Sequence, residues 1–119
     1  MNKKDMRVRH SKALQDIVKD PHIIGFTDVE RIDIEKPFRN SNGIIIGEAD
    51  LIIHKRGLVY VAEYKCTDYN HGRIKAEVQL MRASFGIPIT YGLEVKGLLY
   101  IHGKFNVERL KEGQWEWFK

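Results

Sequence analysis

The chain has 119 residues, of which 43% are hydrophobic and 30% charged, and its net charge is +4 at pH 7. This length suits one domain with a hydrophobic core, and the composition is that of a folded protein without low-complexity stretches. The single cysteine, Cys66, excludes an internal disulfide and a cysteine-ligated zinc site within the chain. No apolar run approaches the roughly 20 residues of a membrane span, and the first residues lack a secretory signal, so we expect a cytoplasmic protein without membrane contacts.

The first predicted element is an amphipathic helix over residues 5–19, which ends before Pro21. Its core-facing stripe includes Met6, His10 and Leu14 at helical spacing. Residues 29–37 follow as a strand, because branched apolar side chains alternate there with charged ones up to a proline. Asn, Ser and Gly then predict a turn over residues 39–43.

Two strongly apolar strands are predicted next, over residues 44–53 and 58–65. The polar residues 54–57 between them indicate a four-residue turn, so the two strands form an antiparallel hairpin. Because both runs are almost continuously apolar, we expect them to lie in the centre of the sheet, buried on both faces.

The second half of the chain begins with a predicted helix over residues 71–85, stopped by Gly86 and Pro88. A narrow apolar stripe at helical spacing is expected to face the core and consists of Ile74, Val78, Met81 and Phe85. Further strands are predicted over residues 89–95, 97–102 and 105–110. The aromatic residues after these strands, Trp115, Trp117 and Phe118, are expected to cap the core. The sequence therefore predicts one α/β domain over residues 1–119, with a mixed central sheet flanked by helices in the order helix, three strands, helix, strands.

Three charged residues interrupt the two most apolar strands, namely Asp50, Glu63 and Lys65. A buried charge is costly unless it is paired or binds a metal, so their position calls for a reason. A symmetric turn places Asp50 opposite Val61 and Glu48 opposite Glu63. Side chains alternate along strands, so Glu48, Asp50, Glu63 and Lys65 then project from one side of the sheet.

Convergent carboxylates form a site for a hard divalent cation, with Mg²⁺ as the first expectation and Mn²⁺ as the second. Such a cation polarises a phosphodiester and lowers the pKa of a bound water, while the ammonium of Lys65 orients that water or stabilises developing charge. The pattern therefore predicts metal-dependent hydrolysis of a phosphodiester.

Around these residues the chain resembles the PD-(D/E)XK, or restriction-endonuclease-like, nuclease superfamily. The resemblance lies in Gly-Glu-Ala-Asp-Leu-Ile at residues 47–52 and Ala-Glu-Tyr-Lys at residues 62–65, and it spans roughly residues 5–102. It implies a restriction-endonuclease-like core that hydrolyses DNA phosphodiester bonds, with Asp50, Glu63 and Lys65 as catalytic residues. It also implies that Asp50 and Glu63 bind the metal. The opening motif is similar to small bacterial and archaeal nuclease-like proteins, and the size is similar to archaeal Holliday-junction resolvases.

The chain also departs from the pattern of that superfamily. Many relatives carry a glutamate on the first helix, where this chain offers no obvious match. His10 is interpreted as a hydrogen-bonded residue at the core boundary, with catalytic assistance as the alternative. Some relatives have a glutamine on the helix that follows the strand with the Glu-x-Lys motif, and Gln79 is similar to it. Ala83, however, stands where those relatives have a tyrosine.

Two basic surfaces are candidates for DNA binding. Lys75, Gln79 and Arg82 share one flank of the second helix, and Arg7 and Arg9 belong to a basic N-terminal arm. A solvated charged face is an equally good interpretation of Lys75, Arg82 and the arm. Cys66 is expected to be a buried small side chain that points away from Lys65.

The sequence leaves other functions open. A noncatalytic DNA-binding module with the same fold is the main alternative to a nuclease, and a subunit of a nuclease complex is the next. A junction, a flap and a specific duplex site are open as substrates, as are RNA and a repair or recombination role. A homodimer is compatible with cutting two strands, but one sequence displays no two-fold interface. No nucleotide cofactor is expected.

Overall fold

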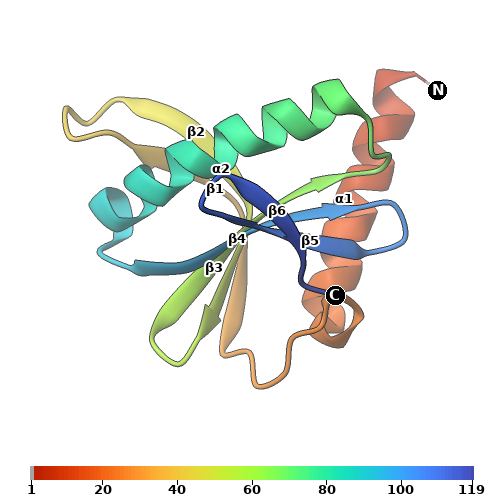
Figure 1. Cartoon of the computed structure of the whole chain (residues 1–119), viewed down its shortest axis with the longest axis horizontal. Helices are drawn as coiled ribbons and strands as arrows, with labels where there is room; N and C mark the ends of the chain where they lie inside the picture. Colours follow the sequence, from red (N-terminus) through yellow and green to blue (C-terminus); the bar gives the residue numbers. More distant parts are fainter. Residues whose placement is uncertain (1) are drawn as a thin grey trace.

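The computed structural model describes residues 2–119 as a six-stranded mixed sheet with one long helix on each face (Figure 1). The strands lie side by side in chain order, and only β3 and β4 run parallel among the five neighbouring pairs. The elements are α1 (Lys3–Lys19), the short 3₁₀ helix η1 (Pro21–Ile24), β1 (Arg31–Arg39), β2 (Ile45–Lys55), β3 (Leu58–Lys65), α2 (Asn70–Tyr91), β4 (Glu94–His102), β5 (Asn106–Lys111) and β6 (Gln114–Trp117). The predicted α/β class and element order are confirmed. No helix within residues 2–119 combines the length and apolar character needed to cross a membrane.

Helix α1 packs its middle and end on one face of the sheet. The side chain of Asn2 caps its start by accepting the N–H of Asp5, and Ala13, Leu14 and Ile17 are buried. Met6, predicted as a core residue, is 47% exposed. The physical reason is that the first turns of α1 project beyond the strands, as Figure 1 shows.

Strand β1 continues past Pro37, where the sequence predicted that it would end. It is an edge strand of the sheet, and Pro37 lies opposite Glu48 of β2. Proline is tolerated on an edge because no second neighbouring strand is present to which its missing N–H would have to donate.

The β2–β3 hairpin has a tighter turn than predicted. Arg56 and Gly57 form a two-residue turn with φ angles of 55° and 77°, the backbone of a type I′ turn. Leu58 therefore pairs with Lys55, and the predicted pairing with Ile53 is wrong by two residues. Since side chains alternate with a period of two, this error moves the pairing without exchanging the faces of β3.

Helix α2 continues through both residues that were expected to stop it. Gly86 lies in close contact with Phe38 of β1, because a Cβ added there would come within 2.4 Å of the Phe38 ring. Pro88 lies in the last turn, and the helix ends at Gly92 in the left-handed conformation. The glycine therefore permits close packing and does not end the helix.

The face of α2 that contacts the sheet is also different from the prediction. The predicted core stripe of Ile74, Val78, Met81 and Phe85 is exposed. The residues that face the sheet are mostly small and comprise Gly72, Ala76, Leu80, Ala83, Gly86 and Ile87. The helix therefore has two apolar faces, one toward the sheet and one toward solvent. The large side chains alone predicted that the solvent-exposed face would pack on the sheet.

The C-terminal part forms three strands. β4 is one continuous strand from Glu94, so the predicted strand at residues 89–95 is wrong at its start, which belongs to α2. β5 agrees with the prediction within one residue at either end, and β6 was not predicted. Phe118 stacks on Phe26, with ring centroids 5.4 Å apart, as expected of a core cap, whereas Trp117 is 68% exposed.

Candidate functional site

Asp50 lies where the pairing of β2 with β3 stops. Leu51 and Ala62 are the last paired residues at this end of the ladder. Beyond them the Asp50 carboxylate accepts the backbone N–H of Tyr64, with Oδ2 2.8 Å from the nitrogen. A side chain thus replaces a backbone hydrogen bond, and the two strands separate at the residues that the sequence singled out.

Glu63 lies against Asp50 and is 6% exposed. Burial and the negative charge of Asp50 raise the pKa of Glu63 to about 10, and a side-chain hydrogen bond joins the two groups. Burial also opposes ionisation of Asp50, but hydrogen bonds from His10, Glu63 and the Tyr64 N–H outweigh it and lower the pKa of Asp50. The two carboxyl groups therefore share one proton and one negative charge at neutral pH.

His10 reaches this pair from α1. Its Nε2 lies 3.2 Å from Oδ2 of Asp50, and this hydrogen bond, working against burial, raises the pKa of His10. Its ring also contacts Tyr64 edge-on, with centroids 5.6 Å apart. The predicted hydrogen-bonded position at the core boundary is confirmed. The sequence could not name Asp50 as the partner, because 40 residues separate the two.

Two adjoining hollows open beside this site. The first, of about 220 Å³, is lined by Arg7, His10 and Lys65 together with residues that follow β3. The second, of about 460 Å³, has Arg9, Lys12 and Lys104 at its border. Tyr64 and Cys66 line both, so the hollows are neighbours. Basic side chains from α1, β3 and the β4–β5 turn therefore line two neighbouring hollows, the first of which contains His10, the partner of Asp50.

Cys66 is half-buried, where the sequence predicted full burial. It packs against the core cluster on the α1 side of the sheet. The contact with both hollows explains the remaining exposure.

The other predicted site residues lie apart from this group. Glu48 is exposed and takes part in no side-chain hydrogen bond found within residues 2–119, although the sequence placed it on the face of Asp50. Gln79 lies over β2. A Cβ added to Gly47 of that strand would come within 3.0 Å of Oε1 of Gln79. Lys75 and Arg82 are exposed on the same flank of α2.

Glu35 also belongs to the group around Asp50, although it was not among the predicted site residues. Its neighbours Ile34 and Lys36 pair with Leu51 and Ala49, so Glu35 stands opposite Asp50. Its φ of 54° lies in the left-handed region, which is unfavourable for a residue with a Cβ. Its negative charge also helps to raise the pKa of His10. No sequence signal marks it, because a charged residue on an edge strand is ordinary.

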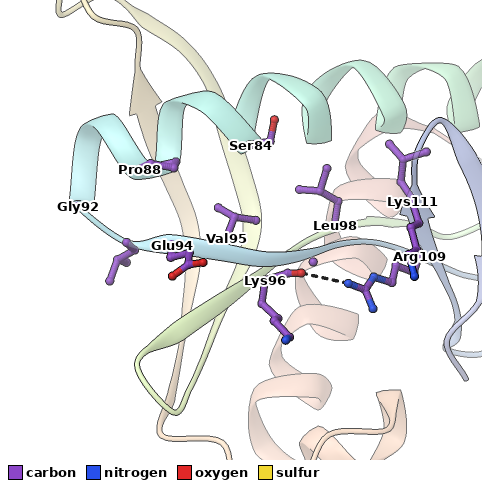
Figure 2. Close-up of a pocket in the computed structure, with 12 residues that line it drawn as sticks. Ser84, Pro88, Gly92, Glu94, Val95, Lys96, Leu98, Arg109 and Lys111 are labelled. Carbon is purple, nitrogen blue, oxygen red and sulfur yellow. Dashed lines mark hydrogen bonds between the residues drawn. The ribbon is translucent and has the colours of Figure 1, made fainter.

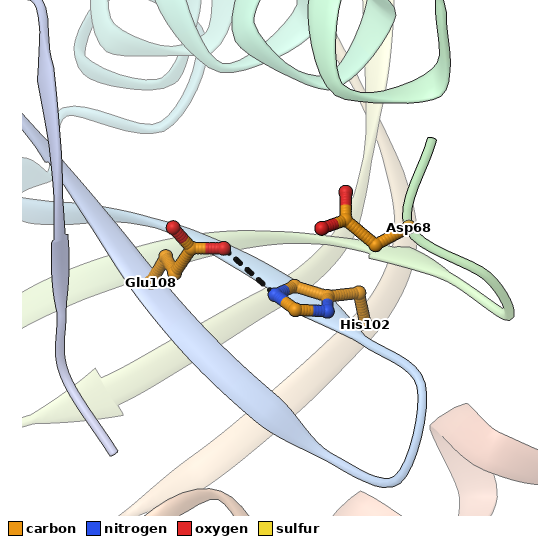
Figure 3. A group of neighbouring side chains, drawn as sticks. All are labelled: Asp68, His102 and Glu108. Carbon is orange, nitrogen blue, oxygen red and sulfur yellow. Dashed lines mark hydrogen bonds and ion pairs between the residues drawn. The ribbon is translucent and has the colours of Figure 1, made fainter. Parts of the chain in front are cut away.

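A second cluster of ionisable groups consists of Asp68 in the loop after β3, His102 at the end of β4 and Glu108 within β5 (Figure 3). Their ligand atoms all lie within 4.8 Å of one another, the one such group of three found within residues 2–119. Nε2 of His102 is 2.7 Å from Oε2 of Glu108, and the hydroxyl of Tyr100 donates to Asp68 over 3.1 Å.

Arg73 of α2 already neutralises this second cluster. Its guanidinium donates to both oxygens of Glu108, at 3.1 and 2.6 Å, and to Asp68 at 2.7 Å. It also lies over the rings of Tyr100 and Trp115, 5.0 and 5.4 Å from their centroids. An arginine among the ligands repels a cation, so the cluster is an ion-pair network that ties α2 to the sheet.

A larger hollow, of about 620 Å³, lies between the C-terminal half of α2 and strands β4 and β5 (Figure 2). Arg109 closes one side by donating to the carbonyl of Lys96 over 3.2 Å. None of the residues near Asp50 lines it. The larger hollow therefore lies apart from the acidic pair, whereas His10 and Lys65 line the hollow of about 220 Å³.

The donor set at Asp50 and Glu63 fits a hard divalent cation. Two buried carboxyl groups share a proton in the metal-free chain, and a cation at this point would replace the proton and neutralise both charges. Lys65 lies close enough that its positive charge opposes the rise in the pKa of Glu63 and of His10, although both stay raised. The arrangement thus combines paired acidic ligands with a nearby ammonium group.

Comparison with known proteins gives no match: no family model aligns with the chain, and neither does any curated protein.

Proposed function

We propose that this protein is a divalent-metal-dependent nuclease that hydrolyses DNA phosphodiester bonds, built on a restriction-endonuclease-like core. The observation that carries the proposal is the buried pair of Asp50 and Glu63, which lie together where β2 and β3 separate. A protein gains no stability from two carboxyl groups buried side by side, so the pair is better explained by a ligand of opposite charge.

In this proposal Asp50 and Glu63 hold Mg²⁺, with Mn²⁺ as a substitute. A bound cation would polarise the phosphodiester and lower the pKa of a coordinated water. The Tyr64 N–H and His10 fix the Asp50 carboxylate by hydrogen bonds, so it is oriented before the substrate arrives. Lys65 stabilises the negative charge that develops on the phosphate during hydrolysis.

The substrate would approach over the two hollows beside α1. Arg7 and Arg9 line these hollows with Lys65 and Lys104, which supplies a positive surface next to the acidic pair. Such contacts bind the phosphate backbone without reading the base sequence. A substrate recognised by shape, such as a junction or flap, fits this arrangement better than a specific duplex sequence.

The test compares wild-type protein with Asp50→Asn and Lys65→Ala on labelled four-way junction, flap, single-stranded and duplex DNA. Each reaction is run with Mg²⁺, Mn²⁺ or chelator. We expect metal-dependent cleavage by the wild type and a loss of at least about 100-fold in both folded variants. Equal cleavage by wild type and Asp50→Asn would show a contaminating nuclease and refute the proposed site.

A noncatalytic DNA-binding module is the second candidate. It is favoured by the hydrogen bond from His10, which already occupies one oxygen of Asp50. Such a module binds DNA equally well with Mg²⁺ and with chelator and cleaves none of the four substrates. Fluorescence anisotropy with the same DNA set separates the two candidates.

A further inference from the structure

Helix α2 has an apolar face that no other part of the described chain covers. Its outward side chains are between 44% and 66% exposed and consist of Ile74, Val78, Met81, Phe85 and Ile89. These residues recur along the whole helix, directly opposite the side that packs on the sheet. A contiguous apolar face on a protein surface normally marks a contact site, so this face indicates a missing neighbour.

The spacing of this face is that of a helix that pairs with another helix. Ile74, Val78, Met81 and Phe85 follow one another at steps of four, three and four residues, which is the alternation of a and d positions in a coiled coil. Val78 and Phe85 then occupy a positions, and Ile74 and Met81 occupy d positions. The seam contains two d and two a positions, and the small residues that face the sheet lie on the opposite side of the helix.

The charges that flank the seam show which partner fits. Glu77 lies on one side and Arg82 on the other, at the g and e positions of this pattern. In two parallel helices a g residue contacts the e residue five positions later on the partner, so Glu77 of one copy meets Arg82 of the other. Neither residue takes part in a salt bridge within residues 2–119.

The opposite orientation is unfavourable. Two antiparallel copies of the helix would place e beside e and g beside g across the seam. Lys75 and Arg82 would then face the same basic residues of the partner, and like charges in contact oppose association. The pattern therefore complements itself in one orientation only.

We propose that the outward face of α2 is the interface of a homodimer, in which the two α2 helices lie side by side and point in the same direction. In this dimer Arg82 contacts a second copy of the chain, whereas the sequence alone suggested that it contacts DNA. The proposal depends on the exposed stripe and its flanking charges and not on nuclease activity. Lys65 directly precedes the loop into the start of α2. Because the two α2 helices point in the same direction, the candidate sites of the two copies would lie at the same end of the dimer.

The first test is the mass of the protein in solution by analytical ultracentrifugation over a range of micromolar concentrations. We expect a dimer for the wild type and a dissociation constant raised about 100-fold by Val78→Glu or Phe85→Glu, which place a charge in the seam. Lys19→Glu, on α1 at the opposite face of the sheet, is the matched control and should leave the dimer intact. A monomeric wild type overturns the proposal and leaves this face to a different protein.

The flanking charges provide a second test that does not remove apolar side chains. Glu77→Arg and Arg82→Glu each place like charges together and should weaken the dimer, whereas the double variant restores the pair and should dimerise as the wild type does. If the double variant is as weak as the single ones, this pairing is wrong.

Orientation is tested by disulfide formation at the end of the stripe. In a Cys66→Ser background, Phe85→Cys should cross-link to itself on mild oxidation, because parallel helices bring the two copies of residue 85 together. Antiparallel helices would keep these positions apart and would instead cross-link Ile74→Cys with Phe85→Cys in a mixture. The mixed product as the main species would refute the parallel arrangement.

Discussion

Glu35 stands directly opposite Asp50 in the β1–β2 pair, and its backbone is in the left-handed conformation with φ at 54°. Ala49 packs in the cluster on the α2 side, and Leu51 packs in the cluster on the α1 side. A regular strand would place both on the same face. The faces of β2 therefore exchange at Asp50, and the strained residue beside it accompanies this change in the strand.

The strain at Glu35 predicts the effect of its replacement. Glu35→Gly should be about 1 kcal/mol more stable than Glu35→Ala, because glycine adopts the left-handed conformation without a steric penalty. Both variants remove the same carboxylate, so their difference reports the backbone alone. Urea denaturation measures the two free energies of unfolding. Equal stability would mean that the backbone of residue 35 relaxes when the side chain is removed.

The proton shared by Glu63 and Asp50 predicts a variant that keeps the fold and loses the proposed activity. Glu63→Gln retains a donor toward Asp50, so its free energy of unfolding should stay within about 0.5 kcal/mol of the wild type. Asp50→Ala leaves the Tyr64 N–H without its acceptor and should cost about 1–3 kcal/mol. Cleavage should be lost in both. A strongly destabilised Glu63→Gln protein would contradict the shared proton.

Metal binding by the acidic pair should stabilise the folded protein. At a Mg²⁺ concentration of 100 times its Kd the gain is about 2.7 kcal/mol, which raises Tm by roughly 10 °C for a domain of this size. The same titration on Asp50→Asn should give little change. Differential scanning fluorimetry records both curves, and an equal rise in the variant would place the metal elsewhere.

The network around Arg73 predicts a loss of stability in acid. Hydrogen bonds from Arg73, stronger than the opposing effect of burial, lower the pKa of both Glu108 and Asp68. A carboxyl group whose pKa is lowered by folding stabilises the protein above its unfolded pKa, and this contribution disappears as pH falls through the folded pKa. Unfolding free energy should therefore decrease from about pH 5 toward pH 2.

Arg73→Met is the variant that tests this network. It leaves Glu108 buried without its cationic partner and should cost about 3 kcal/mol at pH 7. Its unfolding free energy should then depend less on pH in the acidic range than that of the wild type. Denaturation series at several pH values provide the comparison, and parallel pH curves for the two proteins would refute the assignment.

Replacing Gly86 by alanine should destabilise the protein, although helix propensity alone predicts the opposite. Alanine in the middle of a helix is normally favoured over glycine by about 1 kcal/mol. Here the new methyl group would meet the Phe38 ring, so Gly86→Ala should lower stability by about 1–3 kcal/mol. Thermal unfolding of this variant decides the point, since any stabilisation would show that Phe38 can move aside.

Local patterns in the sequence predicted much of the fold. Helical spacing of apolar residues located α1, and apolar runs bounded by turn residues located the β2–β3 hairpin and β5. The apolar setting identified Asp50 and Glu63 as unusual. The register error of two residues arose because Arg56-Gly57 closes a shorter turn than the polar residues 54–57 suggested. Loop composition shows where a turn lies, but backbone conformation determines its length.

Other errors had a tertiary origin. Large apolar residues predicted the wrong face of α2, because the sheet accepts small side chains and Gly86 allows Phe38 to approach closely. The contacts of His10 with Asp50 and of Arg73 with Glu108 join residues 40 and 35 positions apart. Such partners become visible only when the sheet brings them together.

Cys66 has a practical consequence of its own. It is the chain's single cysteine and lines both hollows beside Lys65. A thiol-reactive dye would therefore label one defined position without any engineering. Because that position borders the proposed path of the substrate, occupancy of either hollow should alter the emission of the dye or slow its attachment. The protein thus carries a native reporter through which binding can be followed in real time.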